Sequence, residues 1–166
     1  MSSPFLGAQR ALVVALGDET ALRELGEAQW LPAGAWAAAI ERVRLARFAS
    51  LPEAQGSLEV GRLIGEQFLA SEVGALIRTT LDVLPPERAF ASLVPTFMGR
   101  LRAQFQVDWA TTPSGGTLTL HGARATAPEV TLGVFQAFAR HLPTPCAVTL
   151  GRIEPERLEL RVHFRT

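Results

Sequence analysis

The sequence predicts an α+β domain in which helices pack on one face of an antiparallel sheet made from two C-terminal hairpins. Apolar residues recur every three or four positions as far as about residue 102, and after that they recur at every second position. The order of the elements is helices, hairpin, helix, hairpin, and each predicted strand has one apolar and one polar face. We therefore expect a single domain spanning 1–166, with a helical part at 5–102 and a hairpin-helix-hairpin part at 104–165.

Prolines and capping residues divide the helical part into segments. Asp18 and Ser57 are residue types that cap helix N-termini, so each is expected to begin a helix. The apolar stripe after Ser57 changes phase between residues 71 and 74, which predicts a bend or break, and Pro95 predicts a kink further on. The predicted helices cover 5–16, a segment after Asp18, 35–48, 57–84 and a segment from Glu87.

In the second part, apolar and polar residues alternate along the chain, except in the segment 130–141. Apolar residues alternate with polar ones from Phe105 to Trp109, and a turn rich in Pro, Ser and Gly follows at 112–116. The remaining strands are expected at 117–121, 146–150 and 157–164. A helix is expected at 130–141, where apolar residues return to helical spacing.

Composition excludes several classes of protein. The formal net charge is zero, which argues against nucleic-acid binding, because displacing counterions from phosphates requires excess positive charge. No uninterrupted apolar stretch is long enough for a membrane span, and no signal peptide is visible, so we expect a cytoplasmic protein. The chain has one cysteine and no Lys, Tyr or Asn, so it offers no lysine nucleophile and no tyrosine proton donor.

No group of residues predicts a catalytic, metal or cofactor site. His121 and His163 are expected on polar strand faces and would meet only if their strands were neighbours, and no third ligand accompanies them. His141 is expected at a helix C-terminus, which favours a positive charge. Cys146 is expected on the apolar side of a strand, where burial favours an unreactive thiol. We therefore expect a protein that is not an enzyme and has no cofactor.

Two features remain as candidate binding surfaces. The first is a helix face with closely spaced glycines, which favours close approach of another backbone or of a ligand, and of these we favour helix packing. The second is the polar face of the last strand, where Arg and Glu alternate. That pattern fits a solvated surface, the interpretation we favour, or a protein contact. The helix face is Gly61, Gly65, Phe68 and Gly74, and the partner face is Arg157, Glu159, Arg161 and His163.

The chain resembles an uncharacterised myxobacterial family of proteins about two hundred residues long. The family has a similar series of Leu-Gly-Arg, Phe, Thr, Val-Gly and Gly-Pro-Arg at similar spacing, while Met98–Ala103 departs from its usual polar segment. A GC-rich source would also explain the missing Lys, Tyr and Asn. The residues that carry the resemblance are 5–12, 21–26, Trp36, 60–62, Phe68, Ser71, 73–74 and 86–88.

That family is similar in layout to the ligand-binding fold of haem nitric-oxide sensors, vinyl-reductase-like sensor domains and vesicle-tethering subunits. The resemblance implies helices on an antiparallel sheet, often in a dimer. It does not extend to haem, because the haem sensors hold the propionates with a Tyr-x-Ser-x-Arg motif and this chain has no Tyr.

These observations lead to two functional hypotheses. The first is a non-enzymatic cytoplasmic regulatory or adaptor domain that contacts a protein partner and forms a homodimer. The alternative is a sensor domain that binds a small apolar molecule or lipid in a pocket between the helices and the sheet. An enzyme ranks below both, because no perturbed titratable cluster is predicted.

Overall fold

The computed structural model describes residues 13–14, 16–25, 33–85, 87–92, 106–122 and 126–164. Residues 87–92 form a short helical stretch in addition to the longer elements. The helices are α2 (Glu19–Leu25), α3 (Ala33–Phe48), α4 (Glu53–Ala70), α5 (Glu72–Leu81) and α7 (Pro128–Arg140), and the strands are β1 (Gln106–Thr112), β2 (Gly115–His121), β3 (Cys146–Glu154) and β4 (Arg157–Phe164).

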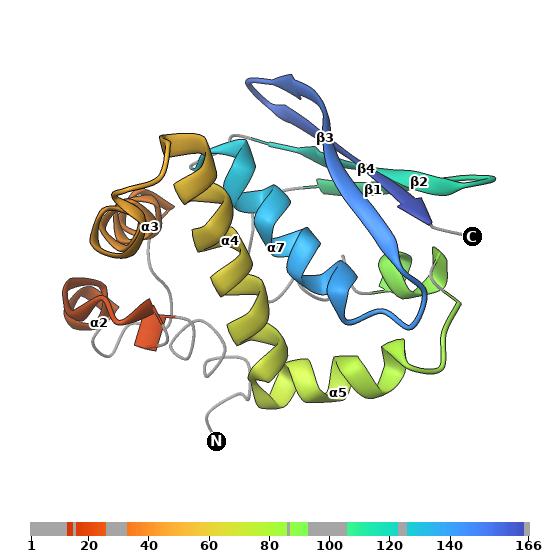
Figure 1. The fold of residues 1–166 in the computed structure, drawn as a ribbon, viewed down its shortest axis with the longest axis horizontal. Helices are drawn as coiled ribbons and strands as arrows, with labels where there is room; N and C mark the ends of the chain where they lie inside the picture. The colour runs from red at the N-terminus through yellow and green to blue at the C-terminus, as the bar shows by residue number, and fades with distance from the viewer. Residues whose placement is uncertain are drawn as a thin grey trace.

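The predicted α+β fold is confirmed. The two hairpins form one antiparallel sheet in the order β1-β2-β4-β3, so the second strand of each hairpin lies in the middle. The helices gather on one side of this sheet (Figure 1). Leu118, Leu160 and Val162 point into the core from the central strands, as the alternating pattern predicted.

Helix α7 lies between the sheet and α4 and is therefore buried on two sides. It contacts β3 on one side and α4 along its length on the other. Eight of its thirteen residues are buried, which matches the nearly continuous apolar sequence from Val130 to Ala139. The helix begins at Pro128, whose missing N–H is not needed in the first turn.

The predicted break near residue 71 is confirmed, but the predicted start of that helical segment is wrong. The backbone leaves the helix at Ser71, which separates α4 from α5. Helix α4 begins at Glu53, directly after Pro52, and Ser57 lies buried in the helix instead of capping it. The φ of Pro52, −52°, already suits a helix start, so the helix begins there without a side-chain cap.

Asp18 caps α2 as predicted and also ties it to α3. Its Oδ1 accepts hydrogen bonds from the backbone N–H groups of Thr20 at 3.0 Å and Ala21 at 3.2 Å. Its Oδ2 accepts a hydrogen bond from Nε of Arg42 at 2.8 Å. Asp18 therefore joins α2 to α3 through a partly buried ion pair.

Some predicted features fall outside the described residues. These are the first part of the N-terminal helix, the kink at Pro95 and the start of the first strand at Phe105. Among the helices that are described, none is both long enough and apolar enough to cross a membrane.

Candidate functional site

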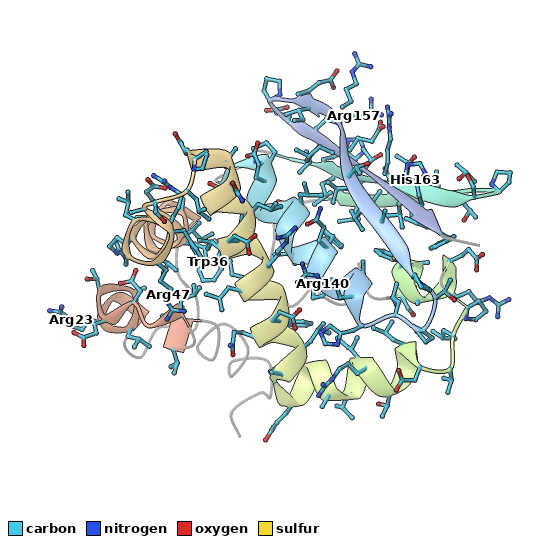
Figure 2. All side chains as sticks on the ribbon, viewed as in Figure 1. Arg23, Trp36, Arg47, Arg140, Arg157 and His163 are labelled. Carbon is cyan, nitrogen blue, oxygen red and sulfur yellow. The ribbon has the colours of Figure 1, made fainter. Side chains whose placement is uncertain are left out.

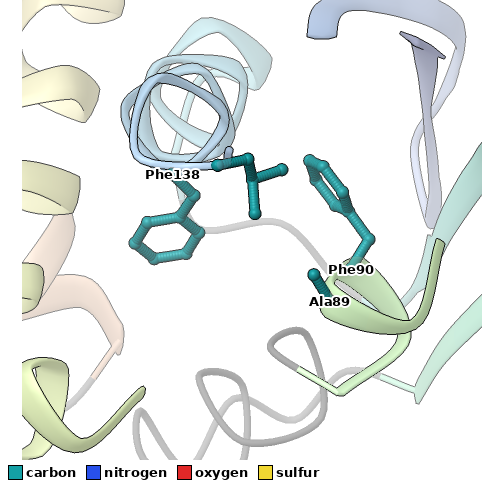
Figure 3. A pocket seen from close by; sticks show the side chains of 4 residues that line it. Ala89, Phe90 and Phe138 are labelled. Carbon is teal, nitrogen blue, oxygen red and sulfur yellow. The ribbon is translucent and has the colours of Figure 1, made fainter. Parts of the chain in front are cut away.

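An apolar depression lies where the helical stretch 87–92 approaches the C-terminal end of α7. Ala89, Phe90, Phe138 and Leu142 line it, and all four are buried. Phe138 and Phe90 enter it from opposite sides (Figure 3). It contains about 140 Å³ of empty space, part of it open to solvent, and no enclosed room for a water molecule. Pockets for drug-sized ligands measure about 300–1,000 Å³, so a ligand enters this depression only if side chains move.

Aromatic rings form the walls behind this depression. The Phe138 ring contacts Phe68 of α4 and Phe135 of α7, with ring centroids 5.8 and 5.7 Å apart. Phe90 stacks on Trp109 of β1, with centroids 5.7 Å apart and planes 9° from parallel. The depression is therefore bounded by α7 and α4 on one side and by an aromatic pair reaching the sheet on the other.

Trp109 is held in place but lacks a hydrogen-bond partner. Its six-membered ring lies over Gly116 of β2, where a β-carbon would collide with the ring. Its Nε1 is buried, and the described residues supply no acceptor for it. Leaving a buried donor unpaired costs about 1–3 kcal/mol, and most buried polar groups therefore have partners.

The glycine-rich helix face lies against α7. A β-carbon at Gly61 would collide with the carbonyl oxygen of Val130, and one at Gly65 would lie 2.8 Å from the carbonyl oxygen of Val134. Gly133 of α7 meets the backbone of α4 in the same way. These contacts agree with the helix-packing interpretation of this face. They do not test whether the face binds a ligand.

The two other members of that face occupy different positions. Phe68 is buried and contacts Phe138, which lines the depression. Gly74 lies in the first turn of α5, where a β-carbon would collide with the backbone of Phe68 and Leu69. Gly61 and Gly65 therefore face α7, whereas Gly74 packs against the C-terminal end of α4.

The predicted partner face lies on the side of the sheet away from the helices. Arg161 is 58% exposed and His163 is also exposed, whereas Glu159 is only 16% exposed. Glu159 lies between two arginines, 3.3 Å from Arg161 and 3.9 Å from Arg157. Figure 2 shows Arg157 and His163 on the strand layer, away from Arg140 at the end of α7. The positive charges on this face are thus partly neutralised within the chain.

The three histidines lie apart from one another. Strands β2 and β4 are neighbours, but their antiparallel register pairs His121 with Arg157 and His163 with Gly115, at opposite ends. His121 contacts Asp108 at 3.1 Å, and His141 follows α7 and contacts Glu66 of α4 at 2.8 Å. Within the described ranges, no three His, Cys, Asp or Glu side chains gather as metal ligands would.

Cys146 packs against the edge of the core. It is half-buried, and burial raises the pKa of its thiol to about 11. The neutral thiol is a poor nucleophile and a poor metal ligand.

The comparisons with known proteins identify the class of fold. No family model and no curated protein matches the chain. Solved structures that resemble it are H-NOX domains. An H-NOX protein from S. oneidensis in the Fe(II)NO ligation state matches over 100% of both chains, with 12% identity and a TM-score of 0.63. A variant of T. tengcongensis H-NOX matches 100% of this chain and 98% of its own, with 11% identity and a TM-score of 0.60. The predicted likeness to this ligand-binding fold is confirmed, at the level of fold.

The residues that the structure describes do not fit a haem group. Haem iron is held by His, Cys, Met or Tyr. The chain has no Tyr, and its three histidines lie on the outer sheet face or at a helix end, paired with carboxylates at two positions. The high pKa of Cys146 opposes the thiolate form, and both methionines lie outside the described residues. The aromatic-lined space is also far smaller than a macrocycle requires.

The sequence did not predict that Ala89, Phe90, Trp109 and Leu142 lie together. Periodicity placed Phe90 and Trp109 on the apolar sides of a helix and a strand, and that signal was correct. Phe90 and Trp109 lie nineteen positions apart in the sequence. No local pattern encodes which apolar side chains contact each other.

Proposed function

We propose that the chain is a sensor domain that binds a small apolar molecule between the helices and the sheet. The observation that carries this proposal is the apolar depression at Ala89, Phe90, Phe138 and Leu142, within a fold similar to H-NOX domains. The described part of its lining contains no charged side chain, so a bound molecule would be held mainly by burial of apolar surface. The protein would act by binding, without catalysing a reaction.

The proposed ligand differs from the one named for a similar structure. The S. oneidensis protein is described in an Fe(II)NO ligation state. The described positions of the histidines support no equivalent iron site, and the apolar depression is too small for a large cofactor. We therefore propose a ligand that binds in the apolar depression without contacting a metal ion.

Native mass spectrometry and thermal unfolding test this proposal. We expect a small neutral molecule to co-purify, or a small aromatic compound such as ethylbenzene to raise the melting temperature. Ala89→Leu fills the depression and is expected to abolish both effects, whereas Ala38→Leu, at an exposed position of α3, leaves them unchanged. The absence of any bound or stabilising compound in the unaltered protein would refute the proposal.

A second candidate function is contact with a protein, including a second copy of the chain. The supporting observation is the outer sheet face, where Arg161 and His163 are exposed and no described helix covers the strands. Glu159 beside two arginines gives this face both signs of charge, as a self-complementary contact requires.

Sedimentation velocity tests that candidate. We expect a dimer that Arg161→Glu weakens at least tenfold, while Arg23→Glu on α2 has no effect. A protein that stays monomeric at all accessible concentrations would refute the homodimer. If Arg161→Glu leaves the dimer unchanged, the dimer contact does not lie on this face of the sheet.

A further inference from the structure

The outer face of the sheet carries opposite charges at its two edges. The side chain of Asp108 on β1 is 59% exposed, and that of Arg152 on β3 is 66% exposed. Asp108 pairs with Thr119 of β2, which in turn pairs with Glu159 of β4. Arg152 lies opposite Glu159 on the other side. These four residues form one row across the sheet, the charged row, which begins at an acidic residue and ends at a basic one.

A β-bulge brings Arg152 to this face. The register shifts between Leu150 and Ile153, which both pair with buried residues of β4, so the two residues between them share the single outer position opposite Glu159. Bulges commonly re-aim a side chain at the edge of a sheet. Gly151 leaves its space to the Glu159 carboxylate, so Arg152 is the side chain that the bulge adds to the outer face.

Both ends of the charged row can bind a second partner. Asp108 contacts His121 at 3.1 Å, and Arg152 contacts Glu154 at 2.7 Å. Both side chains nevertheless remain more than half exposed. A carboxylate accepts several hydrogen bonds and a guanidinium has five N–H donors, so each can bind an opposite charge from outside the chain.

The two central strands differ in the size of their outer side chains. Over most of its length β2 presents short residues, namely Gly115, Thr117 and Thr119, whereas β4 presents long ones, among them Arg161 and His163. Two sheets that pack face to face lie about 10 Å apart, and their side chains interdigitate. Long side chains over short ones fill that space, whereas long ones over long ones collide.

We propose that two copies of this chain pack through the outer faces of their sheets around a two-fold axis parallel to the strands, and that Asp108 of each copy pairs with Arg152 of the other. This inference rests on the homodimer given above as the second candidate function. The arrangement lays β4 of one copy over β2 of the other, and β1 over β3. The charged rows stay level, so the acidic end of each row meets the basic end of the other.

A two-fold axis across the strands fits less well. It would lay β4 on β4, so that long side chains meet long ones and Arg157 of one copy approaches His163 of the other. Asp108 would then lie over Ala110, which has no charge to offer. Glu159 is only 16% exposed and already lies between two arginines, so it is poorly placed to bind a second copy.

The size of the face suits a reversible dimer. Four strands of seven to nine residues, spaced about 4.8 Å apart, present a face of about 500 Å². Two such faces bury about 1,000 Å², which is at the low end for specific interfaces. We therefore expect the two copies to associate at high protein concentration and to separate on dilution.

Charge reversal at the two ends of the row tests this geometry by sedimentation velocity. Asp108→Arg sets arginine against arginine across the dimer, and Arg152→Asp sets aspartate against aspartate. Each variant alone should weaken the dimer at least tenfold. An equimolar mixture of the two should dimerise as the unaltered protein does, because every contact in the mixed dimer again joins an arginine to an aspartate. Native mass spectrometry identifies the mixed dimer by its mass.

The matched controls are Glu72→Arg on α5 and Arg23→Asp on α2. They make comparable charge reversals at exposed positions of the helices, which lie on the other side of the sheet (Figure 1). Neither should weaken the dimer, and neither should restore it when mixed with a reversal at the charged row. A dimer recovered in the mixture also shows that both Asp108→Arg and Arg152→Asp are folded.

The outcomes separate this inference from the function on which it rests. An unaltered protein that stays monomeric refutes the homodimer and this inference with it. A dimer that Arg161→Glu weakens, but that neither reversal at the charged row affects, uses the outer face around a different axis and overturns this inference alone. Loss of the dimer in both variants without recovery in their mixture overturns the pairing of Asp108 with Arg152.

Discussion

The carbonyl oxygen of Val130 occupies the position that a β-carbon at Gly61 would need. This contact brings the backbones of α4 and α7 together in the middle of the fold. Gly133 makes the reciprocal contact with the backbone around Leu58. The position of α7 against the sheet, and with it the wall that carries Phe138, depends on this close approach.

Gly61→Ala is therefore expected to destabilise the protein. The alanine favours the helix by up to about 1 kcal/mol, but the backbone collision forces the two helices apart and costs more. We expect a net loss of about 2–3 kcal/mol in the free energy of unfolding, measured by urea denaturation.

Gly34→Ala is the matched control for that substitution. It makes the same change in α3, where nothing lies within 4 Å of the added β-carbon, and should leave stability unchanged or slightly higher. Equal stability of the two variants would show that α4 and α7 do not approach as described.

Asp18→Ala is expected to loosen the attachment of α2 to α3. The change removes the cap of α2 and leaves Nε of Arg42 without its carboxylate partner. We expect a loss of about 3 kcal/mol, and a smaller loss for Asp18→Asn, which keeps the capping oxygen. Glu41→Ala breaks an exposed ion pair with Arg44 on the same helix and should have little effect. If Asp18→Ala and Glu41→Ala lower the free energy of unfolding equally, the stabilising role of the Asp18–Arg42 pair is contradicted.

Cys146 is expected to react slowly with alkylating agents. Burial raises the pKa of its thiol to about 11, so at pH 8 almost all of it is the unreactive neutral form. An ordinary thiol has a pKa of about 8.5, so alkylation by iodoacetamide at pH 8 should be roughly 200-fold slower in the folded protein than in denaturant.

The raised pKa of Cys146 also makes stability and reactivity depend on pH. Because the folded-state pKa lies above the unfolded one, the stabilisation from the buried thiol is present below about pH 8.5 and is lost as the pH rises towards 11. Alkylation of the folded protein should accelerate across the same range. A rate that levels off near pH 8.5 would mean that the thiol is exposed.

Haem is expected not to form a specific complex with this chain. The histidines at 121, 141 and 163 lie on the surface of the sheet or at the end of α7, away from the aromatic interior. Haemin added to the protein should keep the spectrum of free haemin and show no one-to-one end point. A sharp Soret band that one His→Ala substitution removes would overturn this expectation.

The sequence by itself determined the elements and which face of each is buried. Alternation along 157–164 placed Leu158, Leu160 and Val162 inside and the charged residues outside, because a strand exposes successive side chains on opposite faces. The break at Ser71 and the cap at Asp18 were equally readable, because turn and cap preferences depend on near neighbours. The prediction that Ser57 begins a helix was wrong. Pro52 is also a residue type that precedes helices, and the local sequence does not indicate which of the two positions begins α4.

Only the tertiary structure decided which elements meet. The strand order β1-β2-β4-β3 set His121 and His163 at opposite ends of their strands, although both histidines lie on the polar face. The glycines of α4 predicted a close approach, and the fold determined that α7 is the element that approaches. The contact of Phe90 with Trp109 arises from packing between distant segments, which no periodicity in the chain records.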